Sequence, residues 1–482
     1  MEQKTRKLAT PYELDGRTPL RLAIPLGLQH VLAMFVGNLT PLLVITGAAN
    51  CALQAELQIT LLQNAMIIAG LVTLLQLYPI GPVGGKLPVV MGTSSGFIGV
   101  CASIAASIMA GDASLGVYAY GAILGASLIG GLFEGVLGFF LKPLRKFFPP
   151  VVTGTVVLSI GLSLLSVGVN MFGGGNMAKD FGSAENLILG LIVLTIILLL
   201  KHGTKGITSQ ASLLLGIIAG YVVAALMGLI LPKTGIAADG AEYTKAWVLN
   251  WSKVGNAGWF SVPTPFPVKL QFDIRAILPM CIMFIVTAVE TIGDISGITE
   301  GGMGREATDK ELSGGVVCDG IGSSFAAIFG VLPNTSFSQN VGLVGMTKIV
   351  NRFAIMTGAV FLVLCGLFPK LAAVIQIMPQ SVLGGAAVIM FASIVVSGIQ
   401  LITRNELTPR TITIVAVSLG LGFGLGSTSG ALSKMPQWIQ LVFGGSGIVP
   451  AAIIAILLNV LIPDKKDAGI PPAEEPAPPS EG

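Results

Sequence analysis

The chain has 482 residues, of which 53% are hydrophobic and only 11% are charged, and its net charge is +3. Because soluble domains carry about a quarter charged residues, this composition excludes a water-soluble globular protein. The small net charge gives no indication of a nucleic-acid partner. The 63 glycines are typical of membrane helices that pack closely through small residues.

Apolar runs recur along nearly the whole chain, and a membrane-crossing helix needs about 20 such residues. We therefore predict an all-α, multi-pass membrane protein surrounded by lipid, with about fourteen spans. The predicted span cores are Leu20–Ile45, Ile59–Leu77, Pro88–Met109, Gly116–Leu141, Pro150–Val169, Leu187–Leu200, Ala211–Leu231, Ala276–Ile298, Gly314–Val331, Asn334–Met346, Ala354–Ile375, Val382–Ile402, Ile412–Leu425 and Ile448–Leu461.

The Lys and Arg residues between these spans gather in every second loop, with one exception in the long seventh loop. This positive-inside pattern predicts that both termini are cytoplasmic and that the chain lies in the inner (plasma) membrane. No cleavable signal peptide is predicted at the polar N-terminus. The predicted parts are a cytoplasmic segment (1–19), seven spans (20–231), an extracytoplasmic loop (232–275), seven further spans (276–462) and a disordered cytoplasmic tail (463–482).

Two pairs of similar segments predict that the groups of seven spans are inverted repeats. The stretch 149–154 begins with Pro, ends with Gly and is followed by Gly168, and 379–384 is followed by Gly398 with the same spacing. The two stretches lie in the fifth and twelfth spans. An odd offset of seven spans reverses the direction in which the chain crosses the membrane.

The second pair lies in the third and tenth spans, where Pro and small polar residues interrupt the apolar runs at 88–96 and 333–340. Paired interruptions of this kind point to the binding site of a transporter. We predict a short strand followed by a half-helix in each, with backbone N–H groups facing a ligand. The hydroxyls of Thr93, Ser94 and Ser95 either line this site or cap the half-helix.

Acidic residues inside spans are rare, because each carboxylate there costs about 2.5 kcal/mol or more, and three prominent candidates stand out here. Glu290 and Asp294 are four residues apart, on one face of the eighth span. We predict that Glu290 accepts hydrogen bonds from substrate N–H groups and that Asp294 carries a coupled proton. Asp319, in the ninth span, is predicted to organise the site. The alternative for each acid is a structural hydrogen bond to a neighbouring helix.

Polar side chains in the first and tenth spans complete the candidate site. The Gln339 amide offers both donors and an acceptor, which suits the edge of a purine ring. Asn340 is predicted to hold the unwound backbone, and Ser338 precedes both amides. His30 is predicted to fix the tenth-span segment or, less favourably, to relay protons.

These residues resemble those of one transporter family. The segment 339–348, QNVGLVGMTK, resembles the signature motif of the nucleobase–ascorbate transporters, also called nucleobase:cation symporter-2. Further resemblances are Gln29–His30, Gly92–Ser94, Glu290-x-x-x-Asp294 and Asp319–Gly320, so that the likeness spans nearly the whole chain.

The resemblance implies two inverted repeats of seven spans, a core domain (spans 1–4 and 8–11), a gate domain and a homodimer. By position, Glu290 and Gln339 match substrate-binding residues, whereas Ser95 and Ser338 match positions that offer backbone groups to the base. Gln339 resembles the first motif residue of the xanthine and urate branch, because uracil carriers have Glu there. Asp294 resembles the same branch. Ser94 departs from xanthine-selective members and resembles urate-capable ones.

The predicted function is proton-coupled import of a purine, namely xanthine, urate or both, by movement of the core against the gate. The alternatives are a carrier of uracil or another nucleobase, an anion carrier of a related fold, and a channel. The five cysteines have no paired spacing, and no metal or nucleophile motif is present, so neither a cofactor nor an enzyme is predicted.

Overall fold

The computed structural model describes residues 9–463, except 142–146, 148, 237–240, 405, 429, 437–438, 441–442 and 444–446. Residues 1–8 of the predicted N-terminal segment and 464–482 of the predicted tail therefore lie outside the described residues. The elements of the first half are α1 (Leu20–Thr46), α2 (Ala55–Leu77), β1 (Met91–Thr93), the 3-10 turn η1 (Ser95–Phe97), α3 (Ile98–Met109), η2 (Ala113–Leu115), α4 (Gly116–Phe139), α6 (Pro150–Phe172), α7 (Ala184–Gly203), α8 (Ile207–Gln210) and α9 (Ser212–Ile230).

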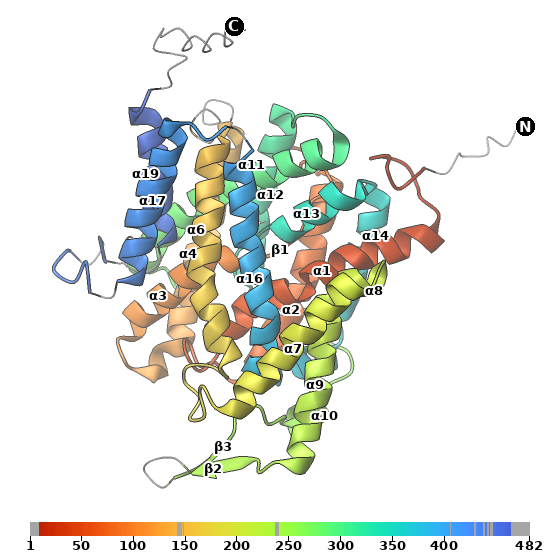
Figure 1. Ribbon diagram of the computed structural model, residues 1–482, viewed down its shortest axis with the longest axis vertical. Helices are drawn as coiled ribbons and strands as arrows, with labels where there is room; N and C mark the ends of the chain where they lie inside the picture. The colour runs from red at the N-terminus through yellow and green to blue at the C-terminus, as the bar shows by residue number, and fades with distance from the viewer. Residues whose placement is uncertain are drawn as a thin grey trace, which may run out of the picture.

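A hairpin of β2 (Thr234–Ile236) and β3 (Glu242–Thr244) follows α9 and projects from one end of the molecule (Figure 1). The remaining elements are α10 (Trp251–Asn256), α11 (Ile274–Met303), α12 (Asp309–Ile328), β4 (Asn334–Ser336), α13 (Ser338–Thr347), α14 (Arg352–Gly366), α15 (Pro369–Gln376), α16 (Gln380–Ile402), α17 (Pro409–Ser427) and α19 (Ile448–Leu461).

Nine helices within the described ranges are long and apolar enough to cross a membrane, or ten if the bent pair α14–α15 is one span. The protein is thus a mainly helical, multi-pass membrane protein. Each of the fourteen predicted segments coincides with one or two helices. The helices α3, α12, α13 and α19 do not belong to the nine or ten helices that are long and apolar enough to cross a membrane. Strands occupy the beginnings of the third and tenth segments, which shortens α3 and α13.

The predicted eleventh span differs from the structure because it is not one straight helix. The chain bends by 83° between α14 and α15. Pro369 begins α15, and it lacks the N–H that a continuous helix would need at this position. The residue before a proline also avoids helical angles, and Phe368 is extended here (φ −109°, ψ 97°).

Glycines bring the helices of the two halves into backbone contact. A Cβ on Gly320 of α12 would lie 2.3 Å from the Gly135 nitrogen of α4, and one on Gly398 of α16 would lie 2.4 Å from the Leu158 nitrogen of α6. Helices α6 and α16 accordingly run side by side in Figure 1. These contacts explain the high glycine content, because no hydrophobic driving force joins helices within lipid.

We expect Gly320→Ala to destabilise the fold, because its added methyl group would overlap the backbone of α4. Overpacking of this kind costs about 1–3 kcal/mol. The melting temperature of the purified protein in detergent should fall. The matched control is Gly420→Ala on α17, where a Cβ would meet nothing within 4 Å. Equal melting temperatures for both variants would contradict the close packing of α4 against α12.

Candidate functional site

Strands β1 and β4 form a two-stranded antiparallel sheet in the middle of the molecule (Figure 1). Met91 pairs with Ser336, and Thr93 pairs with Asn334. Two flanking hydrogen bonds, from Ser94 N to Pro333 O (2.9 Å) and from Phe337 N to Val90 O (3.0 Å), extend this pairing. The backbone groups released by the interrupted helices are thus satisfied inside the protein, as a membrane interior requires.

In each strand, one hydroxyl group makes two hydrogen bonds to the backbone of the first residue, and we call this contact a hydroxyl clamp. Thr73 Oγ1 of α2 accepts a hydrogen bond from Met91 N (2.9 Å) and donates to Met91 O (3.3 Å). Ser323 Oγ of α12 does the same with Asn334, at 2.9 Å to N and 3.0 Å to O. The two strands are therefore held in the same way by corresponding helices of the two halves.

Helix starts follow both strands and face the same space. Ser94 Oγ accepts a hydrogen bond from Gly96 N (3.3 Å) and so caps the turn that leads into α3. Ser338 begins α13, whose preceding residue makes no side-chain cap. The N–H groups at the start of a helix carry partial positive charge and lack helical partners. The site therefore faces the N-terminal ends of two helical segments from two directions.

Glu290 and Asp294 of α11 reach these segments from one side. Ser338 Oγ lies 3.3 Å from Glu290 Oε1 and 3.0 Å from Asp294 Oδ2, and Ser336 Oγ lies 2.6 Å from Asp294 Oδ2. The Ser338 hydroxyl has one proton, so it donates to one of the two carboxylates at a time. The other Glu290 oxygen, Oε2, is buried without a hydrogen-bond partner among the described residues.

Five predicted substrate-binding residues line one small cavity together with the tip of β4. They are Ser94, Ser95, Glu290, Ser338 and Gln339. The Gln339 amide makes no hydrogen bond within the described part of the chain, so its donors and acceptor are available to a ligand. Ile160 of α6 and Ile394 of α16 also line the cavity. The free volume is about 20 Å³, which is room for about one water molecule.

The other predicted site residues lie behind this cavity and not in its lining. Thr291 of α11 donates a hydrogen bond to Asp319 and lies 3.1 Å from Ser336 Oγ, so Asp319 is linked to the site through hydroxyls. Asn340 Nδ2 lies 3.0 Å from the carbonyl oxygen of His30 and 3.2 Å from its Nδ1. His30 thus contacts the tenth-span segment directly.

The sequence interpretation missed Glu134 on α4 and the threonines of α11. Glu134 is fully buried, Thr287 Oγ1 lies 3.2 Å from its Oε1, and its Oε2 has no partner among the described residues. Glu134 carries the same signal as the recognised acids, namely an acidic residue within an apolar span. Thr287 and Thr291 gave no comparable signal, because threonine is common in membrane helices.

None of the buried acids has a basic partner in the described ranges. The ion pairs found there involve other residues, all of them with more exposed side chains. Glu134, Glu290, Asp294 and Asp319 therefore gather around one region without a basic partner among the described residues, with hydroxyl groups as their side-chain partners. Four unpaired negative charges at this depth would be strongly unfavourable. Protonation of some of these carboxyl groups relieves that penalty.

The chain is similar in sequence to known permeases. A family profile described as a permease family matches residues 21–429. The xanthine permease XanP of Escherichia coli is 33% identical over 461 residues, covering 94% of this chain and 95% of that protein. The uric acid transporter UacT of Escherichia coli is 33% identical over 447 residues, covering 92% of this chain and 86% of that protein.

One solved structure shares the fold at low sequence identity. The transmembrane domain of the cyanobacterial bicarbonate transporter BicA superposes with a TM-score of 0.54 at 15% identity, covering 93% of this chain and all of that domain. At this identity, the likeness extends to the arrangement of the helices alone.

Proposed function

The chain belongs to this permease family, the nucleobase–ascorbate transporters, and on that premise we propose that it is a proton-coupled symporter that imports xanthine or urate. The membership confirms the resemblance seen in the sequence, and it makes the chain a membrane permease for nucleobases and not an enzyme. The specific substrate and the coupling ion are the proposed parts.

The observation that carries the proposal is the pairing of Glu290 with Gln339 on one cavity. Glu290 presents an unpaired carboxylate oxygen, which accepts hydrogen bonds from ring N–H groups. Gln339 presents an amide whose donor and acceptor complement an adjacent C=O and N–H edge. Xanthine and urate carry both features on one planar ring system. The backbone groups at Ser95 and Ser338 would complete the hydrogen bonding.

The proposed architecture is fourteen spans in two inverted repeats, with residues 20–231 and 276–462 as the repeats. Helix contacts support it, because α2 packs on α14 as α12 packs on α4, and α1 on α14 as α11 on α4. The matching hydroxyl clamps on β1 and β4 support it as well. Cytoplasmic termini, an inner-membrane location and a homodimer belong to the same proposal.

Alternating access follows from the size of the cavity. About 20 Å³ admits no bicyclic base, so Ile160 and Ile394 must move away from the carboxylates before a purine binds. These two residues belong to α6 and α16, which form one packed unit, whereas Glu290 and Gln339 belong to α11 and α13. Movement of one unit against the other would expose the site to each side in turn.

Proton coupling rests on the charge of the site. Ser338 contacts both Glu290 and Asp294, and no basic side chain of the described residues neutralises either one. A proton bound to Asp294 would remove one buried charge while Glu290 binds the substrate. The loaded site would then cross between its two positions with less desolvation penalty.

An anion carrier is the principal rival, since BicA shares the fold. The described lining of the cavity holds the Glu290 carboxylate and no cationic side chain, so it offers no positive charge to hold bicarbonate, whereas a purine donates ring N–H groups to the carboxylate. A channel is the second rival. It is disfavoured because paired interruptions of two segments, next to buried acids, are typical of alternating access.

We expect Gln339→Glu to impair purine uptake and to shift preference toward uracil. The substitution replaces the amide donor by an acceptor, which leaves a ring C=O unpaired, and a lost hydrogen bond to a buried partner costs about 1–3 kcal/mol. The measurement is competition of unlabelled xanthine, urate and uracil against labelled xanthine. Purine kinetics that match the unsubstituted protein would remove the pairing role of Gln339.

Uptake of labelled xanthine and labelled urate in bacterial cells lacking their own purine carriers tests the proposed substrate. Saturable uptake of either label supports the proposal, and the ratio of kcat/KM for the two labels identifies the preferred base. Membrane-inserted protein that transports neither label, while transporting uracil or hypoxanthine, would overturn the purine assignment.

A further inference from the structure

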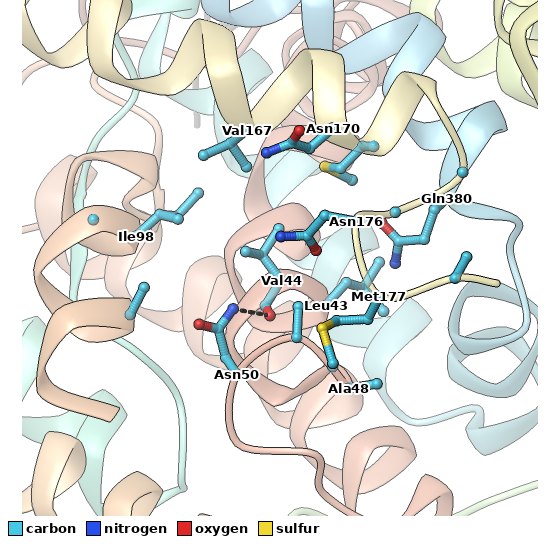
Figure 2. A pocket seen from close by; sticks show the side chains of 18 residues that line it. Leu43, Val44, Ala48, Asn50, Ile98, Val167, Asn170, Asn176, Met177 and Gln380 are labelled. Carbon is cyan, nitrogen blue, oxygen red and sulfur yellow. Dashed lines mark hydrogen bonds between the residues drawn. The ribbon is translucent and has the colours of Figure 1, made fainter. Parts of the chain in front are cut away.

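A second pocket lies outside the central cavity, between the ends of α1 and α6 (Figure 2). Its volume is about 390 Å³, which lies within the range of small-molecule sites, whereas the central cavity holds about 20 Å³. The pocket has mostly apolar walls, to which Leu43, Ile98 and Val167 contribute. It is therefore the larger open space of the two in this conformation.

Four carboxamide side chains line this pocket, each from a different segment. Asn50 follows α1, Asn170 lies in the last turn of α6, Asn176 lies in the following turn, and Gln380 begins α16. We call this set the amide pocket. Figure 2 shows the four amide groups arranged around one hollow.

Three of the four amides are available to a ligand. Asn50 donates a hydrogen bond to Val44 O (2.9 Å), which fixes its position. The amide groups of Asn170, Asn176 and Gln380 make no hydrogen bond within the described part of the chain. Each therefore offers two N–H donors and one acceptor oxygen toward the pocket or the water that enters it.

The ligand class follows from the charge and the walls of the pocket. Its lining contains no Asp, Glu, Lys, Arg or His. A strongly charged ligand such as a phosphate would find no counter-ion there. Amides that carry donors and acceptors side by side, between apolar walls, fit a planar heterocycle with alternating C=O and N–H groups.

The amide pocket and the central cavity lie along one interface, between α6 and the η1–α3 segment, and we call this interface the seam. Val167 lines the amide pocket, and Ile160 lines the central cavity seven residues earlier on α6, which is about 10 Å along a helix axis. On the opposite wall, Ile98 lines the amide pocket and Gly96 lines the cavity. A ligand that moves along this seam would meet the amide pocket before the carboxylates.

The turn that carries Asn176 is held in place from outside the pocket. Asp180 accepts hydrogen bonds from Asn186 Nδ2 (3.0 Å) and from the backbone N of Ala246 (3.1 Å), next to the β2–β3 hairpin. Lys245 also pairs with Glu185 at 2.7 Å. The amide pocket is thus built on an anchored turn and is not a loose surface loop.

We propose that the amide pocket is a second nucleobase-binding site, occupied by the substrate on its way to the Glu290 cavity. Under the proposed topology it opens to the extracytoplasmic side, where the β2–β3 hairpin lies. The proposal rests on the proposed function for the identity of the ligand class. It adds a binding step in which amide side chains, and no carboxylate, form hydrogen bonds with the base.

Protection of an engineered cysteine from alkylation tests the proposal. Met177 lines the amide pocket and is 65% exposed, so Met177→Cys places a reactive thiol at its mouth. The background carries Cys281→Ala and Cys365→Ala, because the other three cysteines are buried. A membrane-impermeant maleimide then reports on this position. The matched control is Asn256→Cys, which is exposed on α10 and absent from the pocket lining.

We expect saturating xanthine or urate to slow alkylation of Met177→Cys and to leave Asn256→Cys unaffected. Protection should persist when Glu290→Gln is added, because that change disables the central cavity alone. Protection that disappears with Glu290→Gln would overturn the proposal, since it would report movement driven by the central site. Equal alkylation with and without both bases would also overturn it.

A kinetic test separates this proposal from the proposed function. The double variant Asn170→Leu and Gln380→Leu keeps side-chain size and removes two amides, so KM for uptake should rise about fivefold or more with kcat maintained. An unchanged KM in the double variant, with wild-type uptake intact, would contradict the second binding site and leave the proposed function unaffected. Absence of nucleobase uptake by the wild type would sink the proposed function itself.

Discussion

Glu290→Gln is expected to abolish purine uptake while the protein still reaches the membrane. The substitution keeps the size of the side chain and removes the negative charge that faces the cavity. Hydrogen bonds to a charged group contribute about 1.5–3 kcal/mol each, so kcat/KM should fall by about 10- to 100-fold for each bond to the substrate. Two such bonds would reduce uptake to background.

The loss must be separated from a folding defect. Glu290 contacts Ser338, and a glutamine oxygen accepts the same hydrogen bond, so the fold should be retained. The melting temperature and the amount of protein in the membrane measure this directly. Glu306→Gln is the matched control, because Glu306 is exposed in the loop before α12. Normal uptake by Glu290→Gln would eliminate the carboxylate as the substrate-binding group.

Asp294→Asn is expected to uncouple transport from the proton gradient. An asparagine oxygen still accepts hydrogen bonds from Ser336 and Ser338, but the amide takes up no proton. Accumulation of labelled xanthine against its gradient should therefore be lost. Exchange of labelled for unlabelled xanthine across the membrane, which needs no net proton movement, should continue.

The size of this effect follows from the membrane potential. One charge that moves through 100 mV contributes about 2.3 kcal/mol, which supports about 50-fold accumulation. The variant should approach equal concentrations on both sides, and a protonophore should not alter that ratio. Accumulation by Asp294→Asn that a protonophore abolishes would place the coupled proton elsewhere, with Glu290, Glu134 and Asp319 as the other buried carboxyl groups of this region.

The membrane class and the grouping of the candidate site residues could be predicted from sequence, because both depend on local patterns. Runs of apolar residues mark spans, and a proline followed by small polar residues marks an interruption. The interruptions at 88–96 and 333–340 indeed coincide with β1 and β4. Mid-span acids are conspicuous for the same reason, since each is expensive in lipid.

The features of the site that could not be predicted from the sequence depend on contacts between distant segments. Nothing in the sequence around Thr291 indicates that its hydroxyl lies between Asp319 and Ser336. The amide pocket is built from four segments between residues 43 and 380, and no local pattern indicates that they meet. Glu134 is a different case, because its position within an apolar span is by itself a signal of a functional acid. The bend at Pro369 was equally visible, yet continuous hydropathy favoured one straight span.

The central claim is that a proton gradient drives purine import through the Glu290 site. The most direct measurement is uptake of labelled xanthine and urate into proteoliposomes with an acidic exterior, with and without a protonophore. We predict saturable accumulation of one or both bases that collapses when the protonophore is added and is absent from Glu290→Gln vesicles. Accumulation that the protonophore does not change, or equal uptake by the Glu290→Gln protein, would contradict the account.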